Sequence, residues 1–423
     1  MANVCVLGLG YVGLHLAVAA TSAGHKVLGL DTDVEKIQLL REGVSPVETV
    51  SNETLNKAIV SGFTPLILEE LGVLPSTTWV ICVPTPLDSS QSPDLGAVVS
   101  AANFISGHIK RGDSVILEST TYPGTCREVV LPILERSGLR VSDDFLFGYS
   151  PERVDPANKE FNIENTTKIV AGFCDESLRA LSEFYLTFIP SVFPLTSLEE
   201  AELTKLFENT FRLVNIALVN DLAVLTDKMG LSASRVLSAA ATKPYGFMKF
   251  TPGSGVGGHC IPIDPHYLNF THQRILGVAS SLISSAHEKN TFMPRFVVDK
   301  LLRKFAGVTD QTTKTRIVLL GVSYKANVSD IRETPAIEIL RYLREENIES
   351  CFYDPLVPEF IVDGIITCRL NSLREIEQTD LVLLLQGHKE ILENLASIRS
   401  DNLLDTSGSL EAVPSHNPNW SSL

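Results

Sequence analysis

Short apolar runs separated by helical patterns dominate the first part of the chain. Residues 4–7, 79–83, 114–117, 145–149 and 168–171 are each apolar enough for a buried strand, and several helical patterns lie between them. Strands that alternate with helices along a sequence are typical of a parallel, doubly wound sheet with helices on its faces. The pattern therefore predicts an α/β domain at the N-terminus.

The pattern changes over residues 197–228. Apolar side chains such as Leu203, Leu206 and Phe207 recur there at intervals of three and four residues, which is the period of a helix. A helix of this length often joins two domains or lines a dimer interface.

Strands return after a polar stretch at 307–315 that we interpret as a linker. The runs 316–321, 350–353 and 381–385 predict a second α/β unit, whereas the polar, proline-containing segment 414–423 predicts a loose tail. The chain is thus expected to hold two similar α/β halves around a helical middle.

Composition limits what the protein can do. A length of 423 residues predicts two to three domains, and 35 basic against 50 acidic side chains argue against a protein that coats nucleic acid. No stretch has the ~20 uninterrupted apolar residues that cross a bilayer. Seven cysteines without a CxxC pair argue against a zinc ribbon or a secreted disulfide framework. We therefore expect a cytoplasmic protein that does not enter the membrane.

A glycine-rich turn follows the first predicted strand. Gly8, Gly10 and Gly13 form a GxGxxG pattern before a helical pattern at 14–22, and Asp31 closes a second predicted strand. In a dinucleotide fold these glycines allow a tight turn, close approach to the pyrophosphate, and close helix–strand packing. The acid accepts hydrogen bonds from a ribose diol and repels a 2′-phosphate, so the motif favours NAD over NADP. The alternative is a tight turn that binds nothing.

A second glycine-rich segment, at 251–265, surrounds a cysteine. Glycines before Cys260 let the backbone approach a ligand and leave the thiol accessible, and a thiol can attack an aldehyde. Asp264, four residues further on, can activate water or orient a base. Three alternatives stay open here: a buried small hydrophobe, a flexible loop, and a metal site of Cys260 with His259 and His266, whose spacing matches no structural zinc site.

Together, these motifs resemble the UDP-glucose/GDP-mannose dehydrogenase family. The resemblance is carried, in the family's order and over nearly the whole chain, by GLGYVG, PTPLDSSQSPDL, ESTTYPGT, GYSPERVDPAN, EEAELTKLFENTFR, GVGGHCIPIDPHYL and GVSYKANVSDIRETPA. It implies an enzyme that uses two NAD to oxidise the C6 alcohol of a nucleotide sugar to a carboxylate.

The resemblance also implies an α/β fold of two Rossmann-like doubly wound domains, joined by a long central helix and a helical dimerisation region. The implied domains are an NAD-binding domain at 1–196, a central helical domain with the catalytic cysteine loop at 197–306, and a UDP-sugar-binding domain at 307–423. At least a homodimer is expected.

Roles for single residues follow from the resemblance. Cys260 matches the family's nucleophile: its thiolate adds to the aldehyde of the first oxidation, the thiohemiacetal gives up a second hydride, and water cleaves the thioester. Lys205 and Asn209 match a Lys-x-x-x-Asn pair that stabilises oxyanion charge from one helix face. Water and proton handling is assigned to Asp264, Glu152 and Thr120.

The implied binding residues are spread along the chain. Those expected to hold NAD are Gly8, Gly10, Tyr11, Val12, Gly13, Asp31, Lys36, Thr85, Thr120 and Arg332. Those expected to hold the UDP-sugar are Glu152, Arg153, Lys205, Asn209, Phe250, Gly257 and Lys325. Four structural alternatives stay open: Lys205 as a solvated helix charge, Glu152 as a capping carboxylate, Arg332 paired with Asp330 or Glu333, and Arg153 in a structural ion pair. His388 is given no role, and no metal is expected.

Departures from the family pattern narrow the choice of sugar substrate. UDP-glucose and GDP-mannose enzymes typically carry GGSC and then a lysine before the aspartate, whereas this chain has His259 and Ile263 there. GGHCIPIDP and SPERVDP resemble enzymes that act on N-acetylhexosamines, and residues 243–250 favour UDP-N-acetylglucosamine as substrate. UDP-N-acetylmannosamine and UDP-glucose are the alternative substrates. A two-electron alcohol dehydrogenase and a non-catalytic nucleotide-sugar-binding protein are the alternatives of other classes.

Overall fold

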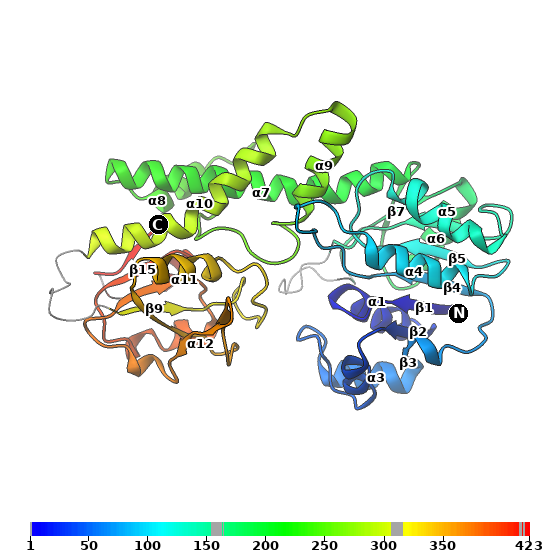
Figure 1. Ribbon diagram of the computed structural model, residues 1–423, viewed down its shortest axis with the longest axis horizontal. Coiled ribbons are helices and arrows are strands. Elements are labelled where there is room, and N and C mark those ends of the chain that lie inside the picture. The colour runs from blue at the N-terminus through cyan, green and yellow to red at the C-terminus, as the bar shows by residue number, and fades with distance from the viewer. Residues whose placement is uncertain (1, 154–162, 164, 306–315, 414–416, 418) are drawn as a thin grey trace. The chain divides into compact units, whose positions relative to one another are not determined.

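The structure is a computed structural model that describes residues 2–153, 163, 165–305, 316–413, 417 and 419–423. The chain divides into two compact units (Figure 1), one of residues 1–208 with 266–278 and the other of residues 209–265 with 279–423. The predicted linker at 307–315, and with it the predicted domain boundary at 306, lies outside the described residues.

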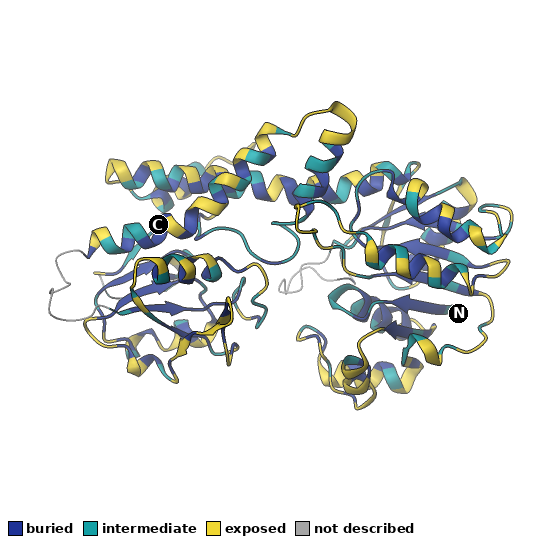
Figure 2. Cartoon of the chain, in the orientation of Figure 1, coloured by how far each residue is buried: buried dark blue, intermediate teal, exposed yellow. Residues whose placement is uncertain are grey.

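The first unit is built on one eight-stranded sheet with the order β3-β2-β1-β4-β5-β6-β7-β8. Its strands are β1 (Asn3–Leu7), β2 (Lys26–Asp31), β3 (Phe63–Ile67), β4 (Thr77–Ile81), β5 (Ser114–Leu117), β6 (Leu146–Tyr149), β7 (Lys168–Gly172) and β8 (Val192–Leu195). The five runs predicted as strands are β1, β4, β5, β6 and β7. Their apolar side chains are buried, so the sheet is dark in Figure 2.

One pair of strands departs from the prediction. Neighbouring strands run parallel except β6 and β7, which are antiparallel with Tyr149 opposite Ala171. The doubly wound α/β fold is confirmed, but this sheet is mixed at one pair instead of parallel throughout. A chain that leaves and re-enters a sheet at the same edge gives an antiparallel pair. Lys168, the first residue of β7, consequently lies at the edge where β6 ends.

Helices cover both faces of this sheet. They are α1 (Tyr11–Ser22), α2 (Val34–Arg41), α3 (Asn52–Ser61), α4 (Gly96–Ser106), α5 (Leu131–Leu134) and α6 (Asp175–Tyr185). Leu16 of α1 and Leu55 of α3 belong to one core cluster, whereas Ala102 of α4 and Leu134 of α5 belong to another. Each cluster buries one face of the sheet, which leaves the strand ends for binding.

Helix α7 (Leu198–Met229) confirms the long helix predicted over 197–228. Glu199 and Glu200 lie in its first turn, where the helix dipole favours negative charge. Gly230 follows its last residue with φ +67°, a left-handed conformation that commonly ends helices. Both ends of the helix therefore have a local signal in the sequence.

The second unit is built on a six-stranded parallel sheet with the order β13-β10-β9-β14-β15-β16. Its strands are β9 (Arg316–Leu320), β10 (Glu349–Tyr353), β13 (Cys368–Arg369), β14 (Leu381–Leu384), β15 (Leu403–Asp405) and β16 (Ser421–Ser422), beside a small pair of β11 (Ile361–Val362) and β12 (Ile365–Ile366). Its helices are α8 (Ala233–Ala240), α10 (Ser281–Lys304), α11 (Pro335–Glu345), α12 (Lys389–Glu393), the part of α7 from Asn209 onward and the start of α9 (Asp264–Leu276). The runs predicted as strands at 316–321, 350–353 and 381–385 are β9, β10 and β14.

The predicted loose tail is wrong for the last four residues. Trp420 is buried and its indole N–H donates to the Ser400 carbonyl (3.0 Å), and Ser421–Ser422 pair with β15. An indole that finds both apolar contacts and a hydrogen-bond acceptor holds the chain end in the core. Leu423 is buried in the core as well, so two apolar side chains fix a segment that the overall composition predicted to be loose.

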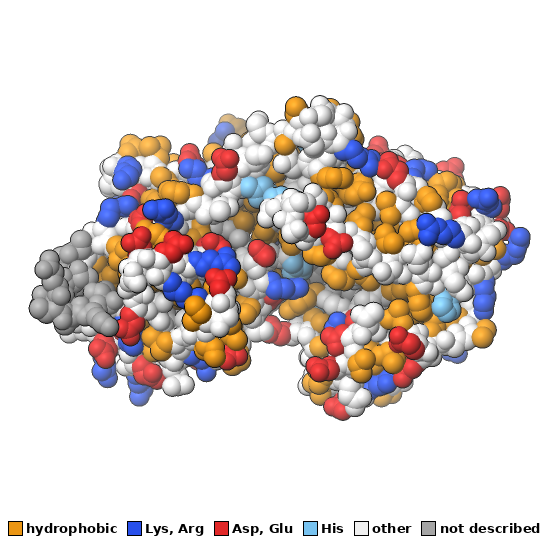
Figure 3. Space-filling model, viewed as in Figure 1, with side chains coloured by type: hydrophobic (Ala, Val, Ile, Leu, Met, Phe, Trp, Pro, Cys, Tyr) orange, Lys and Arg blue, Asp and Glu red, His pale blue; other side chains and the backbone are white. Residues whose placement is uncertain are grey.

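The surface is mixed in charge. Figure 3 shows Lys and Arg side chains scattered among Asp and Glu side chains over the visible face of both units. The acidic excess of the sequence is thus dispersed and not gathered on one element of that face.

Candidate active site

The first βα turn is packed so tightly that two of its glycines are required by space. A Cβ on Gly13 would lie 1.8 Å from the Gly8 carbonyl oxygen, and one on Gly8, whose φ is +92°, would lie 2.7 Å from the Cys82 carbonyl oxygen. A Cβ on Gly10 would meet nothing within 4 Å. Gly10 therefore faces open space at the N-terminus of α1, where Tyr11 and Val12 form the first turn.

Asp31 ends β2 beside this turn and is held ionised. Its carboxylate accepts the Leu9 N–H (2.8 Å) and the Asp33 N–H (3.0 Å), and Lys36 Nζ lies 2.9 Å away. Burial works against the negative charge, but the lysine and the two N–H groups outweigh it and lower the pKa of Asp31. A carboxylate fixed in this way can still accept a ribose hydroxyl, and Lys36 lies at the same place.

Three further residues predicted for the site lie along the same edge of the sheet. Thr85 follows β4, Thr120 follows β5 and Glu152 follows β6, and these strands are neighbours in the sheet. Ligands of doubly wound sheets bind outside the carboxyl ends of the strands, at the point where strand order reverses. Here that point lies between β1 and β4, next to the glycine turn.

Glu152 is the centre of a group of charged side chains in the first unit. Its backbone carbonyl accepts Lys205 Nζ (2.7 Å), and its carboxylate accepts Lys168 Nζ (3.0 Å) and the Arg153 N–H (2.9 Å). Lys205 is half-buried and bonded, so the alternative of a solvated helix charge is wrong for it. Lys168 was not singled out from the sequence.

Arg153 and Arg332 each form an ion pair with an acidic side chain, as the structural alternatives for these two residues predicted. Arg153 lies 2.7 Å from Glu208 and donates to the Thr167 carbonyl (2.9 Å). Arg332 lies 2.6 Å from Asp330. Their contacts with substrate and cofactor stay predictions, and each would have to be made beside an acidic partner.

The cysteine loop of the second unit is joined to helix α7 by a buried hydrogen bond. Asn209, one helical turn after Lys205, donates its amide to the Asp264 carboxylate (2.5 Å), and both side chains are buried. The Asp264 N–H in turn donates to the Cys260 carbonyl (2.9 Å), so the half-buried cysteine lies one turn before α9. Three residues predicted for catalysis are thus held together by two hydrogen bonds.

The glycines before the cysteine are packed and do not form a loose loop. The Gly258 N–H donates to the Arg332 carbonyl (3.1 Å), and a Cβ on Gly257 would lie 2.8 Å from the Glu333 carbonyl oxygen. A Cβ on Gly258 would lie 2.8 Å from the ring of Tyr324. The flexible-loop alternative is therefore wrong. The substrate residue predicted at Phe250 packs its ring against Phe211, with centroids 6.0 Å apart.

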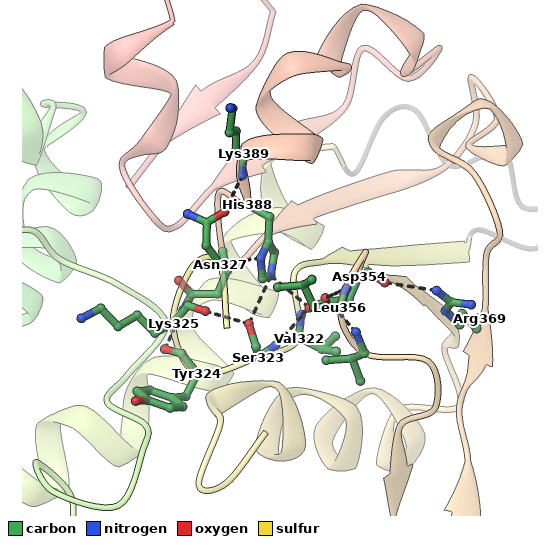
Figure 4. A network of polar contacts seen from close by, with 12 residues as sticks. Val322, Ser323, Tyr324, Lys325, Asn327, Asp354, Leu356, Arg369, His388 and Lys389 are labelled. Atoms are coloured by element: carbon green, nitrogen blue, oxygen red, sulfur yellow. Dashed lines mark hydrogen bonds and ion pairs between the residues drawn. The ribbon is translucent and has the colours of Figure 1, made fainter. Parts of the chain in front are cut away.

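A buried histidine that was given no role fixes the loop after β9 (Figure 4). His388 Nε2 lies 3.1 Å from the Asp354 carboxylate and 3.1 Å from the Ser323 hydroxyl, and Nδ1 accepts the Asn327 N–H (3.0 Å). Burial opposes the charge of Asp354, but His388 and backbone N–H groups lower its pKa. The side chain of Lys325, on the same loop, points away from this network in Figure 4.

Asp354 and His388 had a detectable signal in the sequence. Each follows closely after a predicted strand, and β10, β9 and β14 are neighbours. Polar residues at the carboxyl ends of neighbouring parallel strands meet at one edge. The two residues hold in place the loop that carries the predicted substrate residue Lys325.

Comparison with known proteins gives the family. Three domain definitions of the UDP-glucose/GDP-mannose dehydrogenase family match: the NAD binding domain at residues 2–189, the central domain at 199–291 and the UDP binding domain at 318–411. The UDP-N-acetyl-D-glucosamine 6-dehydrogenase of Pseudomonas aeruginosa is 38% identical over 359 residues, which are 84% of this chain and 83% of that protein.

Two archaeal proteins cover more of the chain. The UDP-N-acetyl-D-mannosamine dehydrogenase of Methanocaldococcus jannaschii is 32% identical over 421 residues, or 96% of this chain and 92% of that protein. The solved structure of UDP-D-ManNAc dehydrogenase from Pyrococcus horikoshii matches with a TM-score of 0.87 at 30% identity, and covers 99% of this chain and 98% of that chain.

These matches define the class: the protein is an NAD-dependent dehydrogenase, an oxidoreductase that acts on a nucleotide sugar. The chain belongs to the UDP-glucose/GDP-mannose dehydrogenase family, so the resemblance in its motifs is confirmed, as is NAD as the cofactor. The first βα turn fits this cofactor, because Gly10 leaves space for the pyrophosphate and Asp31 is ionised at the end of β2. Among the described residues, no helix is long and apolar enough to cross a membrane.

The two kinds of glycine in the first turn predict two different defects. Gly13→Ala forces a methyl group into the Gly8 carbonyl, so it should destabilise the protein by about 1–3 kcal/mol or more. Gly10→Ala is accommodated without a clash and should keep the wild-type melting temperature, but should weaken NAD binding. Thermal unfolding and NAD titration of both variants check this. A Gly13→Ala protein as stable as wild type would contradict the packing argument.

Cofactor choice should follow Asp31. Asp31→Asn keeps an acceptor for the Leu9 N–H but removes the charge that repels a 2′-phosphate, and it leaves Lys36 without its carboxylate. We expect the preference for NAD over NADP to fall at least about tenfold, which is ~1.4 kcal/mol. Steady-state kinetics with both cofactors measure it, and an unchanged ratio would show that Asp31 does not contact the ribose.

Proposed function

We propose that the protein oxidises the C6 hydroxyl of a UDP-N-acetylhexosamine, with UDP-N-acetylglucosamine as the first candidate, to the uronate in a four-electron reaction. The observation that carries the proposal is the cysteine loop, in which Cys260 lies one turn before an Asp264 that Asn209 holds by a buried hydrogen bond. A two-electron alcohol dehydrogenase has no use for such a cysteine, because it stops at the aldehyde.

The proposed chemistry assigns one task to each residue. When bound, NAD accepts the hydride that leaves C6 in each oxidation. Lys205 and Asn209 stabilise negative charge on the C6 oxygen, since donors fixed before the charge develops need no reorganisation. The Cys260 thiolate adds to the aldehyde carbon, and the thiohemiacetal gives up the second hydride to leave a thioester. Water then cleaves the C–S bond, with Asp264, Glu152 and Thr120 to orient it and accept its proton.

Binding of the two ligands is proposed for the residues named from the sequence. The cofactor is held by the glycine turn, Asp31 and Lys36, with Thr85 and Thr120 along the same sheet edge. The residues proposed to bind the UDP-sugar are those named from the sequence, Glu152, Arg153, Lys205, Asn209, Phe250, Gly257 and Lys325. Arg332 is proposed to bind the cofactor, beside its ion pair with Asp330.

The choice of sugar rests on two supports. A relative at 38% identity carries the name UDP-N-acetyl-D-glucosamine 6-dehydrogenase, and the sequence has His259 and Ile263 where UDP-glucose enzymes carry serine and lysine. UDP-N-acetylmannosamine is the second candidate, since relatives and a solved structure that span more of the chain carry that name. The two sugars differ only at C2, so the same machinery serves either.

Assembly and location are part of the proposal. Helix α7 exposes Phe207, Leu218 and Leu225, which are 63%, 66% and 55% accessible, and a homodimer would cover such an apolar row. We place the enzyme in the cytoplasm, where its cofactor is available. The domain limits of 1–196, 197–306 and 307–423 remain our proposal.

A panel of UDP-sugars tests the substrate. We expect the highest kcat/KM with UDP-N-acetylglucosamine, then its manno epimer, and little turnover of UDP-glucose. A pocket that pairs with an acetamido group leaves polar groups unmatched when the group is missing, at a cost of about 1–3 kcal/mol. Absorbance of NADH gives the rates. Faster turnover of UDP-glucose than of both N-acetyl sugars would overturn the assignment.

Stoichiometry tests the cysteine. Wild-type enzyme should form two NADH for each sugar oxidised and release no aldehyde that a hydrazine traps. Cys260→Ala should bind NAD and substrate but stop at the aldehyde, and Cys260→Ser should lose overall turnover, because a hydroxyl is far less nucleophilic than a thiolate. Lys205→Ala serves as the matched control, because this variant should turn over slowly but keep a Cys260 thiol that reacts with an alkylating agent. Conversion of sugar to acid by Cys260→Ala at a near wild-type rate would disprove the mechanism.

A further inference from the structure

A buried lysine lies between two carboxylates at the carboxyl edge of the first sheet. Lys168 Nζ lies 2.9 Å from the Glu118 carboxylate and 3.0 Å from the Glu152 carboxylate. The side chain of Lys168 is 5% exposed and that of Glu118 is fully buried, whereas that of Glu152 is 15% exposed. The three residues come from β7 and from the positions that follow β5 and β6.

The two carboxylates are held differently. Glu118 accepts the Tyr185 hydroxyl (2.5 Å) at its second oxygen, and the ammonium of Lys168 also lies over the Tyr185 ring, 5.4 Å from its centroid. Glu118 is therefore fixed from two sides and faces the interior. Glu152 is the more exposed carboxylate, and it is the one to which the proposed function gives a task in water and proton handling.

Burial makes this arrangement sensitive to charge. Burial alone lowers the pKa of a lysine, but the two carboxylates outweigh it and raise the pKa of Lys168, so the ammonium is permanent. Burial raises the pKa of Glu118, and Lys168 works against that rise. One ammonium thus stabilises the charged forms of two carboxylates. A closer contact with one carboxylate reduces the stabilisation of the other.

We propose that Lys168 is a positioning residue that holds the Glu152 carboxylate in place and in its charged form, and that Glu118 limits this effect by competing for the same ammonium. The proposal rests on the proposed function for the role of Glu152. The geometry supports it, because Glu118 alone could pair the buried ammonium, yet the same ammonium also lies 3.0 Å from the more exposed Glu152.

The neighbouring titratable groups do not change the direction of the effect. Burial raises the pKa of Cys82 and of Tyr185 well above their usual values, so both stay neutral in the working pH range. In the part of the chain that the structure describes, two further charged side chains contact Glu152 or its neighbour: Lys205, bonded to the Glu152 carbonyl, and Arg153, paired with Glu208. The charges that differ between the variants below are only those of Lys168 and Glu118.

The test uses two substitutions with opposite expected effects on the pH profile of kcat. Lys168→Met removes the positive charge, so Glu152 holds its proton to higher pH. The acidic limb of the pH profile should therefore move to higher pH by about one unit, and kcat should fall at least about tenfold. Glu118→Gln keeps hydrogen-bonding atoms but removes the carboxylate that competes with Glu152 for the ammonium. The acidic limb should therefore move to lower pH. Lys168→Arg should bring the limb back toward wild type.

Controls separate positioning from loss of structure. Lys26→Met, at the exposed first residue of β2 in the same sheet, should leave the profile and kcat unchanged. Melting temperature and NAD affinity are measured for every variant. If Lys168→Met does not fold, Glu118→Gln still decides the matter, because the proposal requires the acidic limb to move to lower pH in that variant and an unshifted limb overturns it.

An activity-independent readout keeps the two claims apart. The infrared carboxylate band of Glu152, identified by its loss in Glu152→Gln, is titrated in each variant without substrate. If wild-type protein oxidises no UDP-sugar, the proposed function fails, yet the band still tests the charge sharing. Shifts of the band and the limb in opposite directions in the two variants are the expected result. Shifts in the same direction, or none in either variant, overturn the proposal.

Discussion

The hydrogen bond from Asn209 to Asp264 is the contact on which the cysteine loop depends. Both side chains are buried, and the loss of a hydrogen-bond donor to a buried carboxylate is costly. The bond fixes the start of α9 against α7, and the start of α9 carries Cys260 one turn earlier. Glycines with no room for a side chain then set the path of the chain up to the cysteine. The position of the thiol thus follows from this hydrogen bond and from the packing of the glycines.

Much of the fold could be predicted from the sequence, because burial leaves a direct trace in it. Buried parallel strands are continuous apolar runs, and the long helix has a clear period with acids at its start and a glycine after its end. The direction of β7 left no such trace, since the short run at 168–171 would look the same in a parallel and in an antiparallel strand. The last residues show the same limit, because Trp420 and Leu423 are buried at the end of an otherwise polar segment.

In the candidate site, too, some residues could be predicted from the sequence and others could not. Residues within one motif, such as Gly8 with Gly13 or Cys260 with Asp264, have their relation fixed by local geometry, so the family resemblance could name them. Pairings that join distant segments depend on strand order and direction, so they were not predicted, although the strand ends that carry Asp354 and His388 can be recognised in the sequence. Lys168 reaches Glu118 only because β7 reverses, and His388 reaches Asp354 only because β10, β9 and β14 are neighbours. These are the residues that the sequence analysis missed.

The central claim is that Cys260 carries the sugar through a covalent intermediate, and mass spectrometry of a slowed variant tests it most directly. Glu152→Gln should slow the attack of water more than the steps that form the thioester, so acid-quenched protein from a reaction with NAD and UDP-N-acetylglucosamine should carry the acyl nucleotide sugar on the peptide that contains Cys260. The account predicts that this mass is absent when NAD is omitted and absent in a variant that also carries Cys260→Ala. An unmodified Cys260 peptide throughout turnover, in protein that still forms the uronate, would contradict it.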